Sequence, residues 1–333
     1  MSAPSPSAPP GVDATRRPRR RGLLLPAIAF GCAMLLLLGI GGGLTALWLT
    51  GRYDQPSPAA DSSSEAESPS VEPGTWQPLG DGQAPPGSAE ELEQVLASNP
   101  LLDAGLPSPE ECPLPETEGG AVPAEELTDL LEAGAACLAT AWTDALAPAG
   151  IDFAPPAVVV FTTEDLPADA GCEPERFSDS APVVCRADNT LYWPALWDPG
   201  FSHTSAEEAP QLYMWHLSYS YTMFALSAAS LDGYYGALQV ALAEDPDRAD
   251  EAQRRWALQI SCLSSAATFQ MPQGVRPDGR VEEFVTSVEA QASPATAGEP
   301  SPEARAAWVG TGRDSGGVLE GCGTWSAPAD EVA

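Results

Sequence analysis

The chain of 333 residues contains no lysine and only two histidines, His203 and His216. It also lacks a Cys-x-x-Cys pair, a Gly-x-Ser-x-Gly sequence and a glycine-rich phosphate-binding loop. Histidine is the usual ligand of zinc, so its scarcity argues against a structural or catalytic zinc site. The missing sequences argue against an α/β-hydrolase nucleophile and a P-loop nucleotide hydrolase.

Positive charge is scarce everywhere except at the N-terminus. The chain has 47 acidic residues against 15 arginines, which gives a formal net charge of −32. Five of the arginines lie before residue 22. A surface this acidic repels nucleic acid and anionic lipid, so we expect no nucleic-acid partner. The simplest role of the charge is to keep an exported domain soluble.

The N-terminal part of the chain has the pattern of a membrane anchor. Residues 22–50 contain no charged side chain and include four consecutive leucines at 35–38. About 20 apolar residues suffice for a helix to cross the hydrocarbon core. The preceding arginines predict that a disordered tail, residues 1–21, stays in the cytoplasm. A cleaved signal peptide is the alternative, but its apolar region would be shorter, so we expect an uncleaved single-pass anchor.

The rest of the chain divides into a stalk and a domain. Residues 51–87 are rich in Pro, Ser, Asp and Glu, which predicts a disordered acidic stalk. Order is expected from Ser88, because the spacing of Ser88 and Glu91 predicts a helix-capping box. Apolar spacing predicts the following strands and helices. The predicted strands are 158–161, 183–185 and 191–193. One helix is predicted after Pro123, ended by Pro148 and Gly150, and further helices are predicted over 207–230, 247–269, 279–290 and 302–309. Residues 88–333 are therefore expected to form a mainly helical α+β domain with a small sheet.

Seven cysteines are present, and Cys32 lies inside the predicted membrane helix. The other six lie on the outer side, where an even number predicts three disulfides. Six cysteines allow fifteen pairings, and the sequence alone does not choose among them. Chain order favours Cys112–Cys137, Cys172–Cys185 and Cys262–Cys322.

Six short stretches in a fixed order resemble one family. They are Asn-Pro-Leu at 99–101, Cys-Leu-Ala-Thr-Ala-Trp at 137–142, the strand region 155–161, Cys-Arg-Ala-Asp-Asn-Thr-Leu-Tyr at 185–192, Leu-Asp-Gly-Tyr-Tyr at 231–235, and Leu-Gln-Ile-Ser-Cys at 258–262 with Cys-Gly-Thr-Trp at 322–325. Together they resemble the bacterial membrane-anchored neutral zinc metallopeptidases over residues 95–327. The cysteine pattern of that family supports the same three disulfides.

The resemblance implies a zinc site that this chain does not preserve. Such a peptidase needs His-Glu-x-x-His on a helix, so that two imidazoles bind zinc and the glutamate activates water. The matching residues are His216, Leu217 and Ser220, so only the first histidine remains. In the second helix, Ala257 stands in place of the acidic ligand and Ser261 in place of an aspartate. The resemblance thus implies vestigial positions, with no intact catalytic residue, no bound metal and no cofactor.

These inferences favour a catalytically inactive, metallopeptidase-like surface protein that serves as a binding or scaffolding module. Its expected place is the bacterial cell membrane, with the domain outside and a peptide or protein at the cell surface as partner. One alternative is an unconventional zinc peptidase with a relocated site. That site would use His203, His216, Glu207 and Glu208. A second alternative is a structural envelope protein.

Overall fold

The computed structural model describes residues 72–80, 82–292 and 296–333. The predicted tail, the predicted anchor with Cys32, and the first part of the predicted stalk lie outside these residues. Within the described ranges, no helix combines the length and the apolar character needed to cross a membrane.

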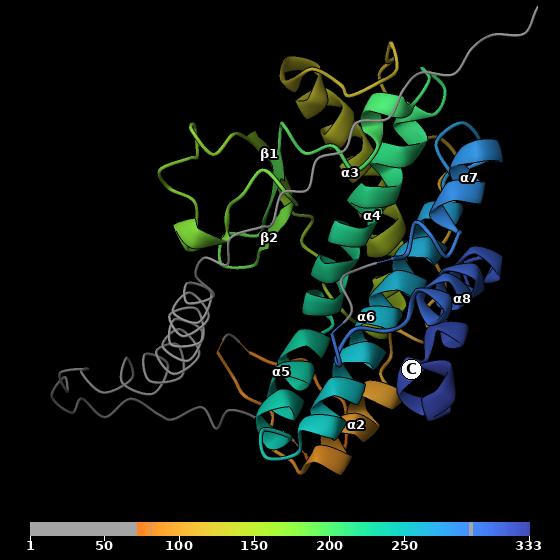
Figure 1. The fold of residues 1–333 in the computed structure, drawn as a ribbon. Coiled ribbons are helices and arrows are strands. Elements are labelled where there is room, and N and C mark those ends of the chain that lie inside the picture. The colour runs from red at the N-terminus through yellow and green to blue at the C-terminus, as the bar shows by residue number, and fades with distance from the viewer. Residues whose placement is uncertain (1–71, 81, 293–295) are drawn as a thin grey trace, which may run out of the picture. The chain divides into compact units, whose positions relative to one another are not determined.

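The described residues form a mainly helical α+β domain with a small three-stranded sheet, as the sequence predicts (Figure 1). The helices are α2 (Ala89–Ala97), α3 (Ala124–Leu146), α4 (Ala209–Ala228), α5 (Leu231–Ala241), α6 (Pro246–Phe269), α7 (Gly279–Val285) and α8 (Pro302–Asp314). Helix α2 begins with the predicted capping box. Glu91 N–H donates to the Ser88 hydroxyl, and Ser88 N–H donates to the Glu91 carboxylate.

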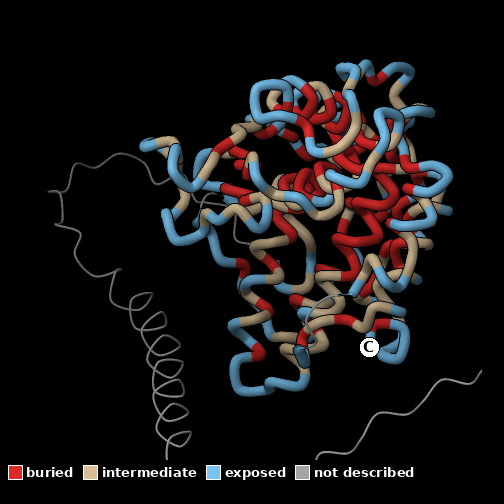
Figure 2. The backbone as a smooth tube through the Cα atoms, turned by 45° about the horizontal axis from the view of Figure 1, so that its top comes forward, coloured by how far each residue is buried: buried red, intermediate tan, exposed pale blue. Residues whose placement is uncertain are grey.

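Helices α4 and α6 form the centre of the domain, with α3 against α4 and α8 against α6. Glycine permits two of these contacts. A Cβ atom on Gly134 of α3 would lie 2.8 Å from Leu217 Cδ2 of α4. One on Gly312 of α8 would lie 2.1 Å from the Cys262 carbonyl oxygen of α6. Buried residues accordingly run along the inner helices, while exposed residues gather in the surrounding loops (Figure 2).

The sheet lies beside α3 and α4 and has the order β1-β3-β2. Strand β1 (Ala157–Phe161) is parallel to β3 (Thr190–Pro194), and β2 (Val183–Cys185) is antiparallel to β3. The turn between β2 and β3 contains Asn189 in the left-handed region, with φ of 52°. This is the hairpin predicted over 183–193, because asparagine tolerates that backbone conformation.

Several predicted helix ends are wrong. The helix predicted over 207–230 ends at Ala228, because Ser230 adopts a left-handed φ of 60°. A separate helix, α5, follows it and was not predicted. Helix α7 ends at Val285 instead of residue 290, and α8 continues to Asp314 instead of residue 309.

Order also begins earlier than residue 88. Residues 72–80 lie across the junction of α4 and α5. The Trp76 indole N–H donates to the Ala229 carbonyl at 2.9 Å, and Leu79 N–H donates to the Ser230 hydroxyl at 3.0 Å. Gln77 N–H donates to the Tyr234 hydroxyl at 3.1 Å. These hydrogen bonds, with Trp76 and Leu79 packed against the core, attach the segment to the domain.

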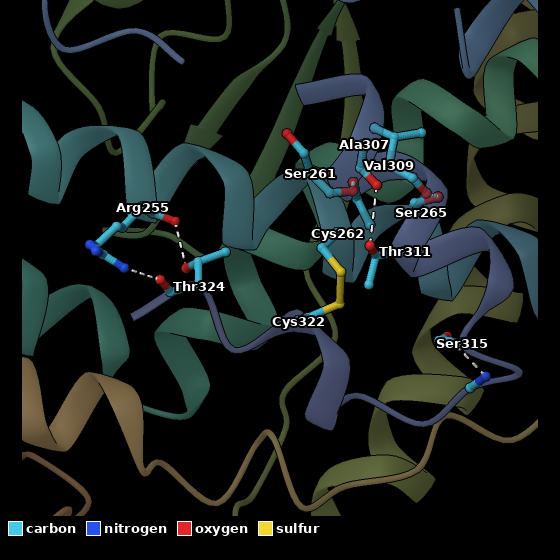
Figure 3. The surroundings of a disulfide bond; sticks show 12 residues. Arg255, Ser261, Cys262, Ser265, Ala307, Val309, Thr311, Ser315, Cys322 and Thr324 are labelled. Atoms are coloured by element: carbon cyan, nitrogen blue, oxygen red, sulfur yellow. Dashed lines mark hydrogen bonds between the residues drawn. A yellow bond between two sulfur atoms is a disulfide. The ribbon is translucent and has the colours of Figure 1, made fainter. Parts of the chain in front are cut away.

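All three predicted disulfides are present: Cys112–Cys137, Cys172–Cys185 and Cys262–Cys322. The last joins α6 to the C-terminal segment (Figure 3). Beside it, the Thr324 hydroxyl donates to the Arg255 carbonyl at 2.8 Å, and the Arg255 guanidinium donates to the Thr324 carbonyl. Three disulfides are typical of an extracytoplasmic domain, since the cytosol keeps thiols reduced.

Candidate functional site

His216 lies on α4 between two aromatic rings. Its ring centroid is 5.0 Å from that of Trp197 and 5.6 Å from that of Phe201, both edge-on. Its Nε2 atom is covered and has no hydrogen-bond partner among the described residues. Burial lowers the pKa of His216 to about 4, because a charged imidazolium would lose its hydration without gaining a partner. The side chain is therefore neutral at physiological pH and packed as an aromatic group.

Leu217 occupies the position that the resemblance assigns to the general base. The side chain is 1% exposed and contacts the helix α3 backbone at Gly134. Ser220, at the position of the second histidine ligand, is 6% exposed, and its hydroxyl is 3.5 Å from the His216 carbonyl. A carboxylate or a metal at these positions would lie in a closely packed contact between two helices, which disfavours charge.

On α6, Ala257 and Ser261 are one turn apart. The Ser261 hydroxyl donates to the Ala257 carbonyl at 2.9 Å, so it is bonded to its own helix. Ser261 belongs to a set of buried hydroxyls around α6 that all donate to backbone carbonyls. The others are Ser218, Thr222, Ser264, Ser265 and Thr268. Figure 3 shows Ser265 donating to the Val309 carbonyl of α8. These small side chains let the helices approach closely, and each hydroxyl hydrogen is used in a bond to a backbone carbonyl.

The relocated site does not assemble either. His203 is exposed at the end of a short 3-10 helix, Phe201–His203. The Glu208 carboxylate instead accepts hydrogen bonds from Arg280 Nε at 2.7 Å and from Ser205 N–H at 2.8 Å. These bonds lower the pKa of Glu208 to about 2, with the Arg280 hydrogen bond as the largest cause. Throughout the described part of the chain, no three His, Cys, Asp or Glu side chains are close enough to hold a metal ion. The residues present do not fit zinc.

Most aromatic residues of α4 fill the core. Tyr213, Tyr221 and Phe224 are buried. The Tyr213 ring stacks on Phe201 at 3.7 Å between centroids, and its hydroxyl accepts from Val122 N–H at 3.1 Å. Trp215 is only partly buried, and Tyr219 is 38% exposed.

Two hollows lie instead at the N-terminal end of α4. The larger has a volume of about 770 Å³ and is open to solvent. Its walls come from residues 114–117, 205–211 and 273–280. The smaller has a volume of about 240 Å³, and its walls are mainly apolar, with Leu212, Val281 and Phe284 among them. Arg280 borders both.

These hollows could not be predicted from the sequence. Their residues come from three distant segments, and none belongs to a recognisable motif. Only Glu207, Glu208 and His203 were singled out, and for a metal site that does not form. The pairing of Glu208 with Arg280, 72 residues apart, is a tertiary contact that helical periodicity cannot reveal.

The chain matches no known protein family, no curated protein and no solved structure. The resemblance to neutral zinc metallopeptidases therefore stays a prediction based on the quoted residues.

Proposed function

We propose that the domain is a metallopeptidase-like binding module without catalytic activity. The observation that carries this proposal is the position of Leu217. Where the resemblance places a glutamate facing a metal-bound water, this chain has a leucine packed on Gly134 in the core. An apolar side chain takes no proton, so no group at that position generates the nucleophile.

The surroundings of Leu217 support the same proposal. A catalytic zinc needs about three protein ligands and one open position. His216 is enclosed by Trp197 and Phe201, and the hydroxyls of Ser220 and Ser261 are directed to helix carbonyls. Ring packing thus engages His216, and hydrogen bonds within the helices engage Ser220 and Ser261.

We further propose that residues 22–50 anchor this domain to a bacterial membrane, with the domain outside. The arginines before residue 22 and the apolar run support this topology. The disulfides support an oxidising compartment for the domain. Residues 72–80 of the predicted stalk are hydrogen-bonded to the domain, and the earlier part of the stalk lies outside the described residues.

The experiment measures zinc and peptidase activity on the same purified full-length protein. We expect substoichiometric zinc by elemental analysis and no cleavage of internally quenched peptides, with or without added zinc. Near-stoichiometric zinc, with cleavage abolished by EDTA, would favour the unconventional peptidase instead.

Cross-linking on intact cells then distinguishes a binding module from a purely structural envelope protein. The binding module predicts a discrete cross-linked partner that depends on the folded domain. An anchor-and-stalk variant that lacks residues 88–333 is the matched control. If that variant captures the same partner, the domain is not the binding element.

A further inference from the structure

We propose that the two hollows at the N-terminal end of α4 form one binding groove for an extended peptide segment that carries an apolar side chain next to basic ones. This inference rests on the proposed function and names the ligand class of the binding module. The larger hollow is called the acidic groove and the smaller the apolar pocket.

The apolar pocket provides the anchor position. Leu212 of α4 and Val281 of α7 form its buried floor. Phe284 forms its rim and is 47% exposed. Apolar anchors in such pockets commonly supply most of the affinity of a recognition site. A volume of about 240 Å³ suits a single large side chain.

The acidic groove provides charge complementarity. Its walls contain four carboxylates, from Glu116, Glu207, Glu208 and Asp278, against the single guanidinium of Arg280. Arg280 is engaged by Glu208, and Asp278 exchanges two hydrogen bonds with Gln211, at 3.1 and 3.0 Å.

Two carboxylates in the acidic groove are left without a cation. In the described ranges, no arginine or histidine lies within ion-pair distance of Glu116 or Glu207, and both side chains are exposed. These two carboxylates favour a basic ligand and repel an acidic one.

The walls are held in place before any ligand arrives. The Thr117 hydroxyl donates to the Ala206 carbonyl at 3.1 Å, and Gly120 N–H donates to the Thr204 carbonyl at 2.9 Å. Gly119 lies against the backbone of the facing wall, since a Cβ atom on it would be 2.7 Å from Ala206 N. A preformed site loses less conformational entropy on binding, so even a modest contact area gives measurable affinity.

The shape and the charge of the groove favour a peptide over a metal ion or nucleic acid. Arg280, which is paired with Glu208, borders both hollows, so a ligand that fills both passes over Arg280. An extended peptide does so with side chains two residues apart, because these point to the same face. A metal ion has no cluster of three ligands in the described residues, and nucleic acid is repelled by the net charge of −32.

The test measures fluorescence polarisation of a labelled octapeptide with one leucine and two arginines at alternating positions in a Gly-Ser background. The receptor is the full-length protein in a non-ionic detergent. We expect saturable binding that weakens with salt. Glu116→Gln with Glu207→Gln should weaken binding about five- to tenfold. The control, Asp144→Asn with Glu244→Gln, removes the same charge from exposed positions that do not line the groove and should change affinity by less than about twofold.

Phe284→Ser tests the apolar pocket separately. It should weaken binding of the leucine peptide and leave a peptide with serine in place of that leucine unaffected. Circular dichroism checks that each variant is folded.

Equal losses in the Glu116/Glu207 and Asp144/Glu244 variants would overturn the inference, because only net charge would then matter. Absence of binding to the wild-type protein would overturn it as well. Either result leaves the proposal of a non-catalytic module standing, whereas cleavage of the probe would contradict that proposal and not the groove.

Discussion

Replacing His216 by phenylalanine should make the domain less sensitive to mild acid. The histidine ring lies edge-on to Trp197 and Phe201, and its Nε2 is covered without a partner. Phenylalanine keeps an aromatic ring at this position and removes the unsatisfied nitrogen. At pH 8 we therefore expect the free energy of unfolding to change by less than about 1 kcal/mol.

The magnitude follows from the pKa of His216, which burial lowers from 6.5 to about 4. As pH falls, the unfolded chain binds a proton near pH 6.5, while the folded domain resists until about pH 4. The full free energy of unfolding is thus present above pH 6.5 and falls between pH 6.5 and pH 4. At pH 5 the wild type should have lost about 2 kcal/mol relative to pH 8 through this group, and about 3 kcal/mol once both states are protonated. The phenylalanine variant should lose none of it.

The assay is urea unfolding of residues 72–333, followed by tryptophan fluorescence at pH 8 and pH 5. Carboxylates also titrate in this range, but they contribute equally to both proteins, so the difference isolates His216. His203→Asn is the matched control, because that histidine is exposed, and it should behave like the wild type. Equal pH dependence in the wild type and the His216 variant would refute the view that the ring is desolvated and unpartnered.

Four further outcomes are expected. Gly312→Ala should lower the free energy of unfolding by about 2–3 kcal/mol in urea unfolding, since its Cβ atom would be 2.1 Å from a backbone oxygen of α6. On the same helix, a Cβ atom at Gly310 would lie in open space, so Gly310→Ala should raise the free energy of unfolding by about 0.5–1 kcal/mol. Equal changes in the free energy of unfolding for the two variants would contradict the close α6–α8 contact. Trp76→Ala should release residues 72–80 and expose them to limited proteolysis, and an unchanged digestion pattern would show that the segment is not attached through this ring. Replacing Cys262 and Cys322 by serine should cost about 4 kcal/mol for a separation of 60 residues in the chain-entropy account, and an unchanged melting temperature would contradict a stabilising bridge.

Local patterns predicted much of the fold. Leu127, Leu130 and Leu131 recur at helical spacing and are buried on α3. The hairpin around Asn189 follows from turn chemistry, and the disulfides follow from cysteine order and resemblance. The break at Ser230 could not be predicted in this way, because a serine with positive φ is held by its surroundings and not by its own preference. The attachment of Trp76 depends likewise on a carbonyl 153 residues away.

The candidate site, like the fold, could be predicted only in part. The vestigial positions stay a prediction from the resemblance, which assigns His216, Leu217 and Ser220 to the zinc motif. The sequence could not reveal that Leu217 contacts Gly134, nor that Glu208 pairs with Arg280 beside two hollows. Both contacts depend on how α3, α4 and α7 pack together. The periodicity of a single helix carries no information about this packing.

The central claim is that the domain folds without zinc. Its most direct test is the melting temperature of residues 72–333 with EDTA, without EDTA and with added zinc, beside elemental analysis. A ligand that binds only the folded state adds RT ln(1 + [L]/Kd) to the free energy of unfolding, so removing a structural or catalytic zinc must lower the melting temperature. The packing of Leu217 and His216 predicts the same melting temperature in all three samples and substoichiometric zinc. A clear fall with EDTA that added zinc reverses, together with near-stoichiometric zinc in the untreated sample, would contradict it.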